Sequence, residues 1–125
     1  MRQAVLCAAA VSLGLLASGE RAAAQSDLPD KVYDWVIQEF RAYRELPEPK
    51  VLVACVEWNR ATPPPVFVHN VFATYSGPGS DRPIFLTQLE SDALHRCQKW
   101  QKEKDTDCTC QALDRNGKNV LRAPK

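Results

Sequence analysis

The stretch "KVLVACVEW", residues 50–58, is apolar at nearly every position and rich in β-branched side chains. It is too short for a typical helix, so it predicts a β-strand that is buried on both faces. After "NRATPPP" (59–65), the segment "VFVHNVFATY" (66–75) predicts a second strand. Three consecutive prolines supply no backbone N–H and hold the chain extended. We therefore expect a hairpin whose two strands are joined by a stiff loop.

The segment before this hairpin, "PDKVYDWVIQEFRAYREL" (29–46), predicts a helix. We expect Asp30 to cap its start and "PEP" (47–49) to end it. Apolar residues recur on one face at helical spacing, which is typical of a face packed in the core. They are Val32, Trp35, Val36, Phe40 and Tyr43.

The second half of the chain follows the loop "SGPGSDRP" (76–83). The segment 84–104 begins extended and becomes helical, with Ser91 as the expected cap. "CTCQALDRNGKNVL" (108–121) predicts two short strands joined by a turn at Asn116-Gly117. The order is α-β-β-α-β-β, which predicts an α+β domain of about four mostly antiparallel strands with the two helices on one face.

The chain opens with the features of a secretory signal peptide, namely an early cation, a short apolar run and small residues before Gln25. Cleavage after Ala24 would leave a single domain, residues 25–125, that is periplasmic or secreted, without stable membrane insertion. It would remove Arg2 and Arg21 from 16 basic residues and Glu20 from 15 acidic ones, which leaves zero net charge. A neutral domain lacks the one-sign field that attracts nucleic acid.

Four cysteines remain in residues 25–125: Cys55, Cys97, Cys108 and Cys110. Structural zinc sites usually supply thiolates in C-x-x-C pairs, which this chain lacks, and an exported chain meets an oxidising compartment. No metal or other cofactor is therefore expected, and the cysteines are predicted to staple the domain. Residues two apart on a strand point the same way with Cα atoms nearly 7 Å apart, which disfavours a bond between Cys108 and Cys110.

The favoured pairing is Cys97–Cys108 with Cys55–Cys110, because a strand returning from the helix end reaches the depth of Cys97 after a few residues. Its alternative is Cys97–Cys110 with Cys55–Cys108. The stretch "ALHRCQKWQKEKDTDCTC" (93–110) also resembles small exported bacterial domains of unknown function, which have an Ala-Leu-x-x-Cys helix followed by a strand-borne cysteine. That resemblance implies export and a Cys97–Cys108 bridge, and it supplies no catalytic residue.

Motifs for catalysis or phosphate binding are absent from the sequence. The histidine His69 lies mid-strand, and Glu57 closes the apolar strand before it. We therefore predict a non-enzymatic binding domain for another exported or envelope protein. The expected recognition loops carry Pro63, Pro64, Pro65, Asp81 and Arg82. The alternative is a small periplasmic hydrolase or thiol-redox protein that uses His69, Glu57 or the Cys108/Cys110 pair.

Overall fold

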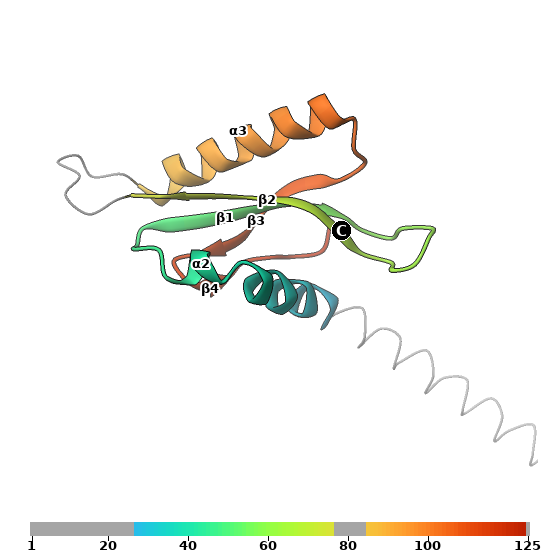
Figure 1. Cartoon of the computed structure of the whole chain (residues 1–125), viewed down its shortest axis with the longest axis horizontal. Helices are drawn as coiled ribbons and strands as arrows, with labels where there is room; N and C mark the ends of the chain where they lie inside the picture. Colours follow the sequence, from blue (N-terminus) through green and yellow to red (C-terminus); the bar gives the residue numbers. More distant parts are fainter. Residues whose placement is uncertain (1–26, 77–84, 125) are drawn as a thin grey trace, which may run out of the picture.

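The computed structural model describes residues 27–76 and 85–124. The expected order of helices and strands is confirmed (Figure 1). The first helix, α1, covers 27–39 in the described part and is followed by the single turn of α2. The remaining bounds are α2 Arg41–Arg44, β1 Lys50–Glu57, β2 Phe67–Tyr75, α3 Leu86–Lys104, β3 Thr109–Arg115 and β4 Lys118–Asn119.

The four strands form one antiparallel sheet in the order β2-β1-β3-β4. Strand β1 is central, and every residue from Lys50 to Val56 is buried. The β3–β4 turn lies at Asn116 and Gly117 as predicted, and both residues have positive φ angles, 53° and 82°. Asn and Gly tolerate that conformation better than other residues, so this dipeptide suits a two-residue hairpin turn.

The two helices lie on opposite faces of the sheet, whereas the sequence analysis expected both on one face (Figure 1). Leu52, Ala54 and Val56 of β1 pack toward α1 and α2. Val51 and Val53, with Cys55, pack toward α3. A strand that is apolar on both faces needs cover on both, so the pattern of residues 50–58 already required two layers of helix.

Two helix boundaries also differ from expectation. Asp30 lies within α1, where its carboxylate accepts a hydrogen bond from Asn119 at 2.9 Å. Helix α3 begins at Leu86, five residues before Ser91. The side chain of Gln88 folds back to accept from the backbone N–H of Phe85 at 3.4 Å, which caps the helix without a Ser or Asp.

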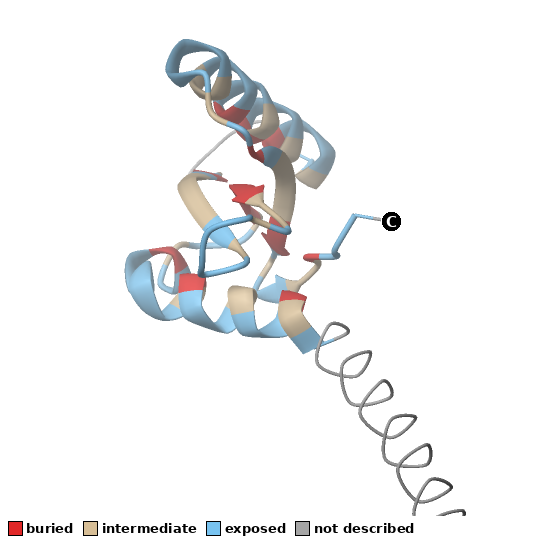
Figure 2. Cartoon of the chain, turned by 90° about the vertical axis from the view of Figure 1, so that its right-hand side faces the viewer, coloured by how far each residue is buried: buried red, intermediate tan, exposed pale blue. Residues whose placement is uncertain are grey.

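Burial is concentrated in the strands and on the helix sides that face them (Figure 2). In the described residues no helix is both long enough and apolar enough to cross a bilayer. The expected signal peptide, residues 1–24, lies outside the described residues, and so do the loop residues Asp81 and Arg82.

Candidate functional site

An apolar groove of about 390 Å³ lies between α1 and the loop that joins β1 to β2. We call it the proline groove. Pro64 and Pro65 line it, so two of the five predicted recognition residues belong to it, while Pro63 is exposed beside it. Its lining is Leu28, Lys31, Val32, Trp35, Pro64, Pro65, Val66, Phe67 and Val68. Lys31 is the charged residue of this set.

Two aromatic side chains of this groove are about half-exposed to solvent. Trp35 is 49% exposed and Phe67 is 41% exposed. The sequence analysis assigned Trp35 and Phe40 to the core together with Val36 and Tyr43. Val36 and Tyr43 are indeed buried, but Phe40, like Trp35, is half-exposed. The apolar stripe of the first helix is therefore wider than the sheet can cover, and its outer members remain on the surface.

The loop keeps a defined shape through a backbone hydrogen bond at its base. The N–H of Arg60 donates to the carbonyl of Pro65 at 2.7 Å. Pro63, Pro64 and the acceptor residue Pro65 have no N–H to satisfy, so an exposed proline run carries no donor cost. This arrangement presents Pro64 and Pro65 as an apolar rim opposite α1.

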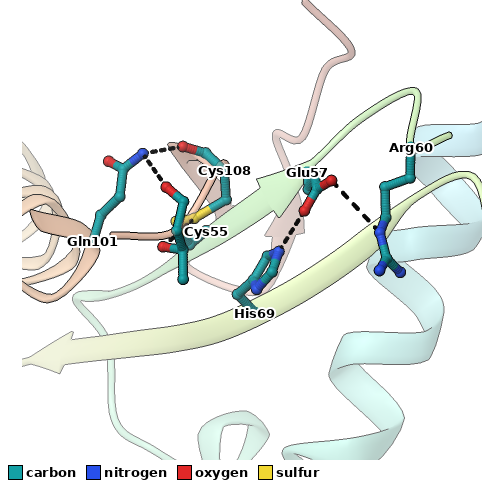
Figure 3. Close-up of polar contacts among 7 residues, drawn as sticks. Cys55, Glu57, Arg60, His69, Gln101 and Cys108 are labelled. Atoms are coloured by element: carbon teal, nitrogen blue, oxygen red, sulfur yellow. Dashed lines mark hydrogen bonds and ion pairs between the residues drawn. A yellow bond between two sulfur atoms is a disulfide. The ribbon is translucent and has the colours of Figure 1, made fainter. Parts of the chain in front are cut away.

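Glu57 and His69, which the alternative hydrolase hypothesis names, are in contact through their side chains (Figure 3). The Nε2 atom of His69 lies 2.7 Å from Glu57 Oε1, and Arg60 Nε lies 3.5 Å from Glu57 Oε2. A bulge makes this contact, because Cys55 pairs with Asn70 and Val56 with Val68, which leaves His69 as an extra residue on β2.

These three polar residues hold one aromatic ring of the proline groove. The Arg60 guanidinium lies 4.8 Å from the centroid of the Phe67 ring, and the His69 ring meets Phe67 edge-on at 4.9 Å. Glu57 binds both partners, so it fixes the ring from two sides. In the described residues, no hydroxyl or thiol forms a hydrogen bond with His69. The geometry therefore makes the pair a support for Phe67.

The four cysteines form two disulfides, with a pairing that differs from the favoured one. Cys55 is bonded to Cys108, with Cα atoms 5.3 Å apart, and Cys97 to Cys110, with Cα atoms 6.0 Å apart. The favoured bridges Cys97–Cys108 and Cys55–Cys110 are therefore wrong, and the alternative pairing is the one present.

The reason lies in the connection from α3 to β3. The favoured pairing assumed that the strand returns directly from Asp105, yet β3 begins only at Thr109. The intervening residues cross from the helix layer to the sheet, and Gln101 on α3 donates to the carbonyl oxygens of Thr106 and Cys108 (Figure 3). The strand therefore begins later in the sequence than expected, and Cys110, not Cys108, lies close enough to bond with Cys97.

The sulfur atoms of the two bridges lie side by side. Cys55 Sγ is 3.7 Å from Cys110 Sγ, and the sulfurs of Cys55, Cys97 and Cys110 all lie within 4.8 Å of one another. Thiolates at such positions could hold a metal ion, but these sulfurs are bonded in disulfides. Cys108 and Cys110 belong to different bridges and are not a dithiol pair.

A second cluster was missed by the sequence analysis because its members lie far apart in the chain. The carboxylate of Asp114, which is fully buried, accepts hydrogen bonds from Tyr33 Oη at 2.6 Å and from Tyr43 Oη at 2.5 Å. The backbone N–H of Gly117 donates to the same carboxylate at 2.8 Å. This cluster ties the first helical segment to the last hairpin.

The pKa of both tyrosines is raised well above its ordinary value. Burial is the largest cause, followed by the hydrogen bond to Asp114 and then by the charge of Asp114. Lys50 is buried beside them and donates to the carbonyls of Tyr43 and Arg44 at 3.1 and 2.9 Å. A cleft of about 420 Å³ opens here. Every hydrogen-bonding group named here has a partner within the chain, which is the pattern of a structural network.

Comparison with family models, with curated proteins and with solved structures finds no match to this chain.

Proposed function

We propose that this chain is an exported, non-enzymatic binding domain that holds another exported or envelope protein at the proline groove. The observation that carries the proposal is the exposure of Trp35 and Phe67 on either side of an apolar groove of about 390 Å³. Exposed aromatic side chains around a concave apolar surface are typical of protein-binding sites, where Trp often contributes most of the binding energy.

The surrounding structure supports this proposal. Glu57 with its two partners holds Phe67 in place, and the hydrogen bond from Arg60 N–H to the carbonyl of Pro65 closes the loop that carries the prolines. A groove whose walls are held in advance loses less entropy when a partner binds. The neutral net charge of residues 25–125 favours recognition by shape and apolar contact over electrostatic attraction.

Photo-cross-linking in the producing cell tests the proposal. A photoreactive phenylalanine analogue replaces Trp35 in one variant and Gln98, on the exposed surface of α3, in the control. We expect position 35 to give a discrete cross-linked product in the exported fraction, joined to a chain that begins at Gln25, and position 98 to give none. Equal products at both positions, or none at position 35, would refute the groove as the binding surface.

A further inference from the structure

The two edges of the sheet are built very differently. One edge is β4, which has two residues including Lys118. The other is β2, which has nine residues and contains no Asp, Glu, Lys or Arg. In the described part of the chain, β2 pairs only with β1, so the backbone groups of its outer side meet no other strand. Edge strands usually carry charges, prolines, bulges or a short length that prevent pairing with another chain, and of these β2 has only the bulge at His69, near its start.

Apolar hollows accompany β2 on the face that α1 and α2 cover. The proline groove reaches β2 at Phe67 and Val68. A second groove of about 420 Å³, which we call the α2 groove, reaches it at Val71 and Ala73 and includes the half-exposed Phe40. Val68 and Ala73 pair with Val56 and Leu52 of β1, which are four residues apart, so about 13 Å along the sheet separates them. The two grooves are therefore spaced along the strand so that a single extended segment can reach both.

We infer that the partner enters as an extended polypeptide segment that pairs with the outer edge of β2 and places alternate large apolar side chains in the two grooves. An extended chain can pair with the backbone N–H and C=O groups of a strand edge one after another, and these hydrogen bonds contribute to its affinity. Because β2 is uncharged and both grooves are largely apolar, the paired part of that segment is uncharged as well. This inference rests on the proposed function, since it names the kind of partner that the proline groove receives.

A second copy of this chain is a poorer occupant of this edge. If two copies paired through their β2 strands, each would present short side chains to the sheet face that carries the two grooves. These side chains are Val68, Val71 and Ala73. Grooves of about 390 and 420 Å³ would remain unfilled. Unfilled apolar space forfeits contact energy, whereas a separate segment can supply Leu, Met or Phe at the alternate positions.

The test selects binders from a display library of random ten-residue segments on the full disulfide-bonded protein. We expect the enriched sequences to alternate large apolar residues with others and to lack charges at the apolar positions. Each enriched peptide is then made in two N-methylated forms, one for each set of alternate amides. One set faces β2 and the other faces solvent, so the first form should bind at least tenfold more weakly and the second should bind as before.

Variants of the protein complete the design. Ala73→Lys places a cation on β2, at an exposed position that lines the α2 groove, and Gln98→Lys adds the same charge on α3 as the control. We expect Ala73→Lys to weaken binding at least tenfold and Gln98→Lys to leave it unchanged. If Trp35→Ser abolishes binding but the two N-methylated forms bind equally, the inference of strand pairing is wrong. The proline groove would still be the binding site. If no segment is enriched, or Trp35→Ser has no effect, the proposed function fails too. Self-association that Ala73→Lys abolishes would overturn the inference in favour of a second copy.

Discussion

Replacement of Tyr43 by Phe removes one hydroxyl group and keeps the ring that packs in the core. The lost group donates to Asp114 Oδ2 at 2.5 Å in a fully buried setting, and Gly117 N–H remains as a donor to the same oxygen. A hydrogen bond to a charged group contributes about 1.5–3 kcal/mol, and the remaining donor places Tyr43→Phe near the middle of that range, at about 2 kcal/mol. For a domain of this size that corresponds to a Tm lowered by roughly 8–16 °C.

Urea denaturation followed by Trp fluorescence measures this change, with Tyr75→Phe as the matched control. Tyr75 is 48% exposed at the end of β2, so its hydroxyl group can bond to water and its loss should change stability by less than about 0.5 kcal/mol. Tyr33→Phe should fall between the two, because Tyr33 is less deeply buried than Tyr43 and water can replace its hydroxyl. A Tyr43→Phe protein as stable as Tyr75→Phe would refute the view that Asp114 holds the first helical segment to the last hairpin.

Four further predictions concern stability and the disulfide pairing. Because the pKa of Tyr33 and of Tyr43 is raised in the folded protein, the unfolded chain loses these protons first as the pH rises. Their contribution to the free energy of unfolding is therefore intact below about pH 10 and falls above it. Denaturation at pH 8–11 should show this loss, and the double Phe variant should lack it. The double variant Cys55→Ser/Cys108→Ser should contain no free thiol in a thiol assay, whereas Cys55→Ser/Cys110→Ser should contain two, and the opposite result would restore the pairing expected from the sequence. Loss of Cys55–Cys108, with a sequence separation of 53, should cost about 1 kcal/mol more than loss of Cys97–Cys110, with a separation of 13, because it constrains a longer loop. Glu57→Gln should lower stability by less than about 1 kcal/mol in denaturation experiments, because its contacts with Arg60 and His69 are partly exposed; a larger loss would show that this pair is a main element of the fold.

The strands were predictable because their signals are local. Residues 50–58 form a short apolar run, and Asn116-Gly117 is a strong hairpin signal, so both features were found at the right place. The same apolar run contained the information that helices cover both faces, but a one-sided arrangement was expected. Helix periodicity shows that a face is apolar and does not show how wide a surface the sheet offers it.

The candidate site was predictable only in part. The proline run marked one wall of the groove, because a loop of this composition is recognisable from sequence. The opposite wall at Trp35 was missed, since an apolar residue at helical spacing is usually buried. Three other features arise from tertiary packing, and no short stretch of sequence encodes them. They are the bulge at His69, the start of β3 only at Thr109, and the contact of Tyr43 with Asp114.

The most direct test of the central claim is the affinity of the partner joined at position 35, measured by titration calorimetry against three forms of the protein. The wild type is compared with Trp35→Ser and with Phe85→Ser, which removes an aromatic side chain that is 64% exposed at the start of α3, away from the groove. We expect Trp35→Ser to weaken binding about 30-fold, the effect of losing about 2 kcal/mol, and Phe85→Ser to leave it unchanged. Equal affinities for all three proteins would contradict the assignment of the proline groove as the binding site.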